Sequence, residues 1–372
     1  MSVAVAVLIG GAVVAVAGIA VYMRATRQKP AAVDPIASTT GSNRTLTGTT
    51  TTGDRLAIHW DEALRRFVAY ALDDAARESL SQPPDPEHAP VFKKVAEILE
   101  RIEAKPEYIP RRPSLLPKLM STVNDPQAAM VEISRIIAQD PALTGNLLRI
   151  ANSAMYRVSS QPIESIDRAV TLVGVQGIRS IIATALLQPV MSAGSGSFSK
   201  FPELVWEHTL YAASAAELHA VNVEKSEPFV SQLIGLLYGL SAIVVFRIVR
   251  DQFAAQPHLS PNPGSVARLL ETWVAPTAGR IAASWELPER LQIALESQTL
   301  AAELQMENSL GRSLRFGRVA GSVIVLCRLG RLTEAEARAI VLAGEARRRE
   351  TERIWDRHMA PSLHSVSASP SA

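Results

Sequence analysis

An uninterrupted apolar run, Val3 to Tyr22 (VAVAVLIGGAVVAVAGIAVY), constrains this 372-residue chain more than any other segment. At 1.5 Å per residue, a helix of this length spans about 30 Å, the thickness of the hydrocarbon core of a bilayer. Gly10 and Gly11 would weaken a helix in water but are ordinary in a transmembrane helix. The run therefore predicts a transmembrane helix over residues 3–22, with the lipid bilayer as its partner.

The residues beside this run predict its orientation. Arg24, Arg27 and Lys29 follow it, and basic residues favour the cytoplasmic side of a membrane. We therefore expect a single-pass protein whose N-terminus lies outside and whose remaining chain is cytoplasmic. A cleaved signal peptide is disfavoured, since it needs a basic segment before the run, where only Met1 and Ser2 stand.

The rest of the chain shows the pattern of an all-α protein with flexible ends. Residues 23–53 are rich in Thr, Ser, Gly, Ala and Pro and are predicted to form a disordered linker, and residues 360–372 a disordered tail. In the helical region 54–105, apolar residues recur at helical spacing, as in Leu56, Trp60, Leu64, Phe67 and Ala71. Residues 301–358 are expected to form C-terminal helices. There, Thr333 with Glu336 predicts a capping box that opens a final helix running to Arg347, Arg348 and Arg349.

Charge and cysteine content exclude several classes of function. The 38 basic and 36 acidic residues give a net charge of +2, so no overall field attracts a nucleic acid, and no nucleic-acid partner is expected. The single cysteine, Cys327, excludes a disulfide framework and the cysteine-based zinc modules. Cys327 lies in an apolar run at helical spacing, which is typical of a buried cysteine rather than a nucleophile.

Three segments carry a family resemblance: SLLPKLMSTVNDP (114–126), IIAQDPALTGNLLRIANSAMY (136–156) and PIESIDRAVTLVGVQGIRSII (162–182). With the later Trp206-Glu207-His208, they make residues 114–300 resemble the HDOD domain, the HD-related output domain of bacterial signalling proteins. The resemblance implies an all-α, multi-helix HD-like bundle and a role in signal transduction. In a bacterium, the predicted transmembrane helix would then lie in the inner membrane.

The same resemblance raises the question of a metal site. HD-type phosphohydrolases, which this family resembles in fold, need a histidine, a His-Asp pair and further ligands that converge on one or two metal ions. His208 stands at the first position, but Tyr238 and Gly239 replace the His-Asp pair, and Ser297 and Gln298 replace a later histidine pair. We therefore expect no catalytic residue, no metal and no cofactor, with His208 left as a vestigial ligand position.

These observations predict a non-catalytic regulatory protein of signal transduction that acts through its helical domain at the cytoplasmic face of the membrane. Its partners would be signalling proteins that the sequence does not identify, with a small-molecule ligand as a further candidate. Two alternatives stay open. One is a divergent metal-dependent HD-type phosphohydrolase acting on a nucleotide, which would lose activity in His208→Ala. The other is a sensor that binds a nucleotide in the vestigial cleft without turnover, and whose melting temperature the ligand would raise.

Overall fold

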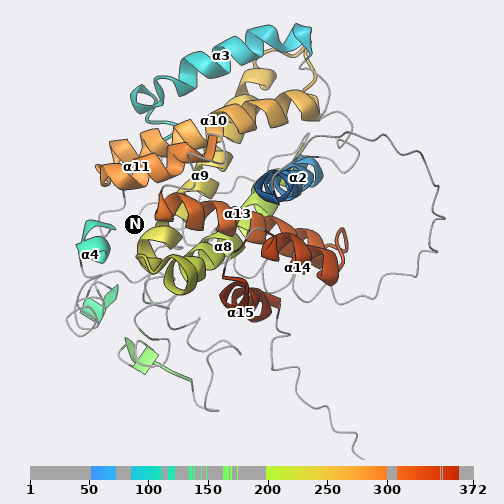
Figure 1. Ribbon diagram of the computed structural model, residues 1–372. Coiled ribbons are helices and arrows are strands. Elements are labelled where there is room, and N and C mark those ends of the chain that lie inside the picture. The colour runs from blue at the N-terminus through green and yellow to red at the C-terminus, as the bar shows by residue number, and fades with distance from the viewer. Residues whose placement is uncertain are drawn as a thin grey trace, which may run out of the picture. The chain divides into compact units, whose positions relative to one another are not determined.

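A computed structural model describes residues 52–72, 85–109, 116–121, 198–299, 308–343 and 347–359, with Arg112, Glu345 and short stretches between 134 and 174 (Figure 1). In the first of these ranges, side chains are described from Trp60 onward. The predicted transmembrane helix, most of the predicted linker and the predicted tail lie outside the described residues. Pro126 and Pro141, in two of the three segments that carry the family resemblance, also lie outside the described residues.

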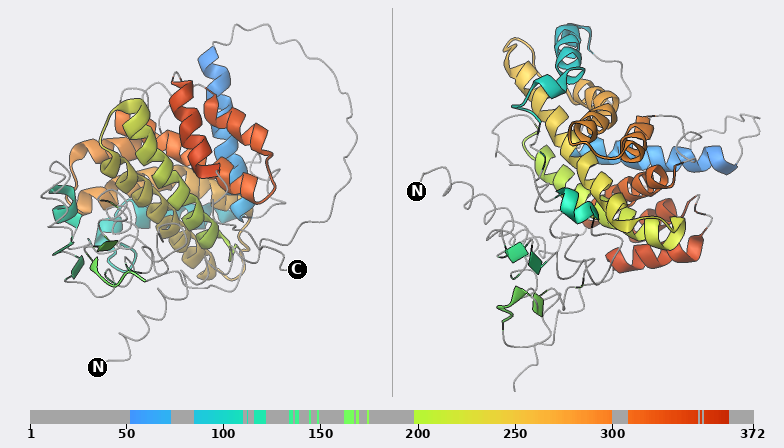
Figure 2. Two further views of the ribbon diagram at one scale, coloured as in Figure 1. Left: turned by 90° about the horizontal axis from the view of Figure 1, so that it is seen from below. Right: turned by 90° about the vertical axis from the view of Figure 1, so that its left-hand side faces the viewer.

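The described residues form helices and no strand, which confirms the predicted all-α class (Figure 2). In chain order the helices are α2 (Thr52–Leu72), η3 (Pro86–His88), α3 (Ala89–Leu99), η4 (Ile102–Ala104), α4 (Leu116–Ser121), α8 (Phe201–His219), the π-helix η6 (Ala220–Glu224), α9 (Pro228–Ala254), α10 (Pro263–Ser284), α11 (Glu289–Glu296), η7 (Ser297–Thr299), α13 (Ser309–Arg328), α14 (Glu334–Leu342) and α15 (Arg348–Met359).

Side chains at the helix starts explain several of these boundaries. Asn262 accepts a hydrogen bond from the backbone N–H of Ser265 at the start of α10, and Asn308 caps α13 in the same way. The capping box of Thr333 and Glu336 is confirmed at the start of α14. The predicted end of that helix is wrong.

Helix α14 ends at Leu342 because Ala343 takes extended backbone angles, with φ −67° and ψ 124°. Arg348 and Arg349 therefore begin the separate helix α15 instead of ending α14.

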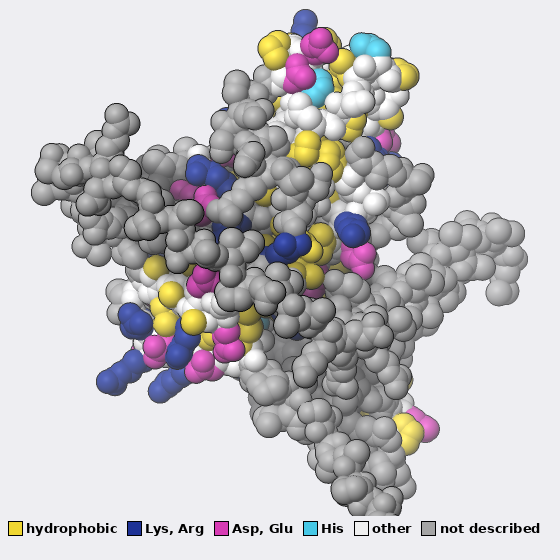
Figure 3. Space-filling model, turned by 90° about the vertical axis from the view of Figure 1, so that its right-hand side faces the viewer, with side chains coloured by type: hydrophobic (Ala, Val, Ile, Leu, Met, Phe, Trp, Pro, Cys, Tyr) yellow, Lys and Arg dark blue, Asp and Glu magenta, His cyan; other side chains and the backbone are white. Residues whose placement is uncertain are grey.

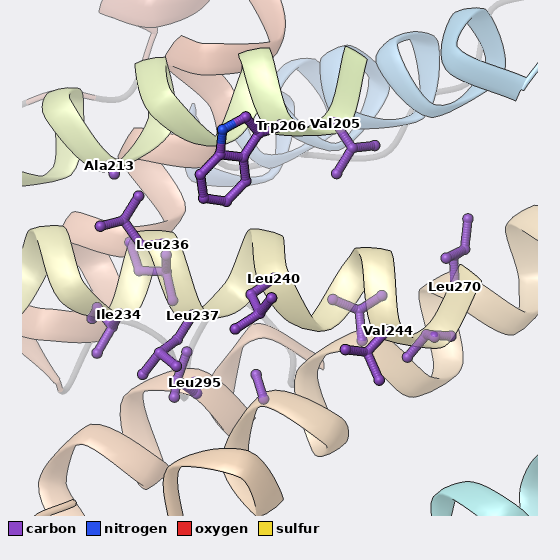
Figure 4. Packing of buried hydrophobic residues seen from close by; sticks show 14 of the residues in the cluster. Val205, Trp206, Ala213, Ile234, Leu236, Leu237, Leu240, Val244, Leu270 and Leu295 are labelled. Atoms are coloured by element: carbon purple, nitrogen blue, oxygen red, sulfur yellow. The ribbon is translucent and has the colours of Figure 1, made fainter. Parts of the chain in front are cut away.

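Helix α8 packs against both α9 and α13, and these are the two most extensive helix contacts in the described bundle. Trp206 of α8 points toward the apolar row that includes Leu236 and Leu240 on α9, as Figure 4 shows. On the opposite side of α8, Gly317 of α13 lies so close to the backbone of Ala212 that a Cβ at this position would overlap with it. Small residues thus allow α8 to approach both neighbours closely.

Helix α9 is long and apolar enough to cross a membrane, and among the described residues no other helix is. In the protein, 83% of its most apolar window is buried, beneath α8, α10 and α3. Its hydropathy is therefore explained by its position in the core. The Val/Ile run 243–249 lies within this helix, as its helical spacing predicts.

The helices that precede the family segment pack onto the same bundle. Helix α2 contacts α13, α10, α8 and α14, and Trp60 Nε1 donates a hydrogen bond of 2.9 Å to the carbonyl of Ile340. Helix α3 packs on α9. Phe67 and Ala71 of the predicted apolar stripe are buried. The described residues from Thr52 onward accordingly belong to one compact unit, in which α2 and α3 pack on the bundle.

Candidate functional site

The structure brings four of the five residues singled out from the sequence into one cleft. His208 of α8, Tyr238 and Gly239 of α9 and Gln298 of η7 line a cavity of about 390 Å³. Ser297 lies next to it and is buried, with its hydroxyl donating to the carbonyl of Ala294 at 2.8 Å. Helices α2, α10 and α13 supply the remaining walls of this cavity, which we call the cleft.

His208 is held by two contacts that suit a neutral structural histidine. Its Nε2 lies 3.0 Å from the carbonyl oxygen of Arg318, a geometry in which the ring donates its proton. The ring of Phe67 is stacked on it, with centroids 4.4 Å apart and planes at 22°. Burial lowers the pKa of His208 to about 4, so the imidazole is neutral at pH 7.

The space beside Gly239 is filled by another side chain. A Cβ atom added to Gly239 would overlap with the hydroxyl and methyl groups of Thr209, one residue after His208 on α8. The Thr209 hydroxyl is itself satisfied, since it donates to the carbonyl of Val205 at 2.6 Å. Position 239 therefore has no room for any side chain larger than that of glycine.

Tyr238 and Gln298 are tied to one arginine of α13. The guanidinium carbon of Arg318 lies 4.2 Å from the centre of the Tyr238 ring, and its Nη1 donates to Gln298 Oε1 at 3.0 Å. Burial raises the pKa of the Tyr238 phenol above its usual value, so it is protonated at neutral pH. Tyr238 and Gln298 thus both interact with the guanidinium of Arg318, so a positive charge of the protein itself lies beside them.

The described residues hold no group of three or more His, Cys, Asp or Glu side chains that could bind a metal ion. His219 lies eleven residues after His208 on α8, and its Nδ1 is 3.1 Å from the Ser313 hydroxyl. His88 is buried, with its Nδ1 2.8 Å from the Ser265 hydroxyl. Cys327 is half-buried rather than fully buried.

Several residues that line the cleft were missed by sequence reasoning because they come from helices outside the resemblance. Arg315, Arg318 and Ser322 lie on α13 at the spacing i, i+3, i+7, which places them on one face. Asp61 of α2 forms an ion pair of 3.0 Å with Arg315. The sequence does carry one signal for the residues of α13: arginines recur at every third position, at 312, 315 and 318, within a largely apolar helix.

Charged side chains elsewhere on the described surface are mixed in sign. On the face shown in Figure 3, basic side chains lie beside acidic ones instead of gathering into a patch. Ion pairs such as Arg338 with Glu352 and Arg348 with Glu352 follow this pattern on α14 and α15. The lining of the cleft, with four arginines and two acids, carries an excess of positive charge.

Comparison with protein families matches residues 109–301, just over half of the chain, to the family described as the HDOD domain. Among curated proteins, the chain is similar to an uncharacterized protein of Treponema pallidum (strain Nichols), with 22% identity over 202 residues. The match covers 53% of this chain and 38% of that relative, so the chain spans about two-fifths of the relative's length.

Two solved structures are similar in fold. An HDOD domain protein of unknown function from Geobacter sulfurreducens aligns with a TM-score of 0.47 and 18% identity, over 72% of this chain and 89% of its own. A protein provisionally named as a signal transduction protein, from Marinobacter aquaeolei VT8, aligns with a TM-score of 0.49 and 18% identity, over 76% of this chain and 66% of its own.

Proposed function

The chain belongs to the HDOD domain family, and on that premise we propose that it is a non-catalytic regulatory protein whose helical domain acts by binding rather than by chemistry. The observation that carries this proposal is the filling of the metal position: the Phe67 ring covers His208, and Thr209 occupies the space beside Gly239. A hydrolase of the HD type needs open ligand positions and a metal-bound water at this place.

The charges of the site also favour a role without catalysis. Catalytic metal sites gather carboxylates and imidazoles, whereas the side chain that reaches Tyr238 and Gln298 is the guanidinium of Arg318. A fixed cation at this distance would repel a metal ion. The cleft is therefore suited to an anionic occupant, and the proposed regulatory role does not require turnover.

The test is an activity assay on the full-length chain in detergent micelles. Generic phosphomonoester and phosphodiester substrates are supplied with Mn²⁺, Fe²⁺ or Mg²⁺, and His208→Ala is compared with the wild type. We expect no hydrolysis above the buffer rate and no difference between the two proteins. Metal-dependent hydrolysis that His208→Ala abolishes would contradict the proposal and favour the phosphohydrolase alternative.

We further propose that the protein acts at the cytoplasmic face of the inner membrane, held there by residues 3–22. What supports this is the length of the uncharged run and the basic residues that follow it. Helix α2 begins at Thr52, only 30 residues beyond Tyr22, and it forms one wall of the cleft. The anchor and the cleft would thus be connected through α2.

A further inference from the structure

We propose that the cleft binds a phosphate monoester that carries a compact organic group, of the size of a nucleoside monophosphate, with Arg318 and Ser322 holding the phosphate. This inference rests on the proposed function, because it assumes a cleft without a metal ion. It goes beyond that function in assigning a ligand class and two binding residues. Both residues lie on α13, outside the segment that matches the family.

The first argument is the charge balance of the cleft. Its lining includes Arg65, Arg268, Arg315 and Arg318 against two acidic residues, Asp61 and Glu271. Asp61 pairs with Arg315 at 3.0 Å and Glu271 with Arg268 at 3.2 Å. Each of the two acids is thereby engaged, and two positive charges of the lining remain without a carboxylate partner among the described residues.

Arg318 is one of these two cations, and its setting is that of a binding residue. Stacking on Tyr238 and the bond to Gln298 fix the plane of its guanidinium, while most of its five N–H donors are left for other acceptors. A planar, oriented guanidinium is the group that proteins use most often to bind phosphate through two parallel hydrogen bonds. Arg65, the other cation, is exposed at the edge of the cleft.

The second, independent argument is an unsatisfied hydroxyl. Ser322 is one of the residues that line the cleft, it is buried, and its Oγ has no hydrogen-bond partner among the described residues. Leaving such a group unpaired costs about 1–3 kcal/mol, so it calls for an explanation. Ser322 follows Arg318 by four residues, which places the two side chains one above the other on α13. A phosphate bound to Arg318 would supply the missing acceptor.

The walls of the cleft define the organic part of the ligand. Leu64 and Val68 of α2 and Leu270 and Val274 of α10 are among its lining residues, so the cavity offers apolar surface to an organic group. The volume of about 390 Å³ lies in the range of small-molecule sites and is far larger than a phosphate ion needs. The cleft is therefore built for a phosphate ester rather than for the ion alone.

The experiment measures binding to the full-length chain in detergent micelles by isothermal titration calorimetry. The probes are AMP, GMP, CMP and UMP, with the four matching nucleosides and inorganic phosphate as reference ligands. We expect at least one monophosphate to bind with a submillimolar Kd, and its nucleoside and inorganic phosphate to bind at least about tenfold more weakly. No binding of any monophosphate at millimolar concentration would overturn the inference, and so would equal binding of the nucleoside.

Two variants and a matched control locate the site. Arg318→Gln and Ser322→Ala should each weaken binding by about tenfold. Arg328→Gln should leave the affinity within about twofold of the wild type, because Arg328 stacks on Tyr211 of the same bundle but lies outside the cleft. Equal losses in Arg328→Gln and Arg318→Gln would overturn the assignment.

Ser322→Ala separates a ligand role from a structural one. Because its hydroxyl is unpaired, alanine should leave the stability of the ligand-free protein unchanged or raise it, while the affinity falls. Unchanged affinity in this variant would remove Ser322 from the site. Release of inorganic phosphate from a bound monophosphate would contradict the proposed function, whereas a lack of binding would contradict this inference alone.

Discussion

The ring of Phe67 lies stacked on the imidazole of His208, with the two centroids 4.4 Å apart. This contact joins α2, which precedes the segment that matches the family, to a histidine of α8 within that segment. The imidazole is covered on one face by this ring and bonded at its edge to the carbonyl of Arg318, so His208 acts as a packing residue. Helix α2 therefore belongs structurally to the cleft.

Phe67→Ala should destabilise the protein by about 3–5 kcal/mol, because it removes a buried aromatic side chain from the core and uncovers His208. Phe67→Leu is the matched variant and should cost less than about 2 kcal/mol, since it keeps most of the apolar volume. Denaturant unfolding followed by tryptophan fluorescence measures both free energies. A loss below about 1 kcal/mol in the alanine variant would mean that α2 does not cover the site in solution.

Gly239→Ala should destabilise the protein by more than about 2 kcal/mol, because the new methyl group would overlap with Thr209 in the packed interior between α8 and α9. Gly279→Ala is the control. Gly279 is also a buried glycine within a helix, but its added methyl group meets the flexible side chain of Glu296, which is exposed and can move away.

Thermal unfolding of the two variants compares these sites directly. We expect Gly279→Ala to stay within about 1 kcal/mol of the wild type. Equal stability of the two variants would show that the space beside Gly239 is open, and that an aspartate there could be accommodated.

His208 should make the folded protein less stable in acid. Its pKa is about 4 in the folded state and about 6.5 when unfolded, so between these values the unfolded chain binds more protons. Its contribution is therefore fully present above pH 6.5 and is lost as the pH falls toward 4, by about 3 kcal/mol in total.

The measurement is the free energy of unfolding from pH 4 to pH 7.5 in the wild type and in His208→Gln, which keeps a donor for the Arg318 carbonyl. The half-buried carboxyl of Glu217, whose pKa burial raises to about 7, acts with opposite sign in this window. Only the difference between the two proteins isolates His208. His258→Gln, an exposed site, serves as the control. Parallel curves for the wild type and His208→Gln would contradict the prediction.

The sequence predicted the all-α fold class from local signals. Apolar residues at helical spacing indicated helices, and the substitutions at Tyr238 and Gly239 could be read against the family pattern without coordinates. How these two residues affect the packing around them could not be predicted from the sequence. That Thr209 fills the space beside Gly239 depends on how closely α8 and α9 approach, which is a property of the packed bundle.

The remaining parts of the cleft come from residues far apart in the chain. Asp61 and Arg315 are separated by 254 positions, and no pattern along the sequence pairs them. The capping box at Thr333 was correctly predicted because both partners lie within four residues of each other, whereas the break at Ala343 carries no such local signal. Sequence reasoning thus succeeded where the interaction is local and failed where tertiary contacts decide.

Membrane attachment should depend on residues 3–22 and not on α9. The full-length chain should remain in the membrane pellet after alkaline carbonate washing, and a chain beginning at Asp54 should move to the soluble fraction. The double variant Val13→Arg, Val14→Arg should also reduce membrane insertion, because each arginine at the centre of the run costs about 2.5–3.5 kcal/mol. Retention of the shortened chain in washed membranes would point to another anchor.

The metal content of the purified full-length protein tests the central claim most directly. The protein is isolated in detergent without chelators and without a metal-affinity column, and Mn, Fe, Co, Ni and Zn are quantified per chain by elemental analysis. We predict only trace amounts, because Phe67 and Thr209 occupy the space that ligands and metal would need. One or two transition-metal ions per chain would contradict the non-catalytic assignment and make metal-dependent phosphohydrolase activity the leading hypothesis.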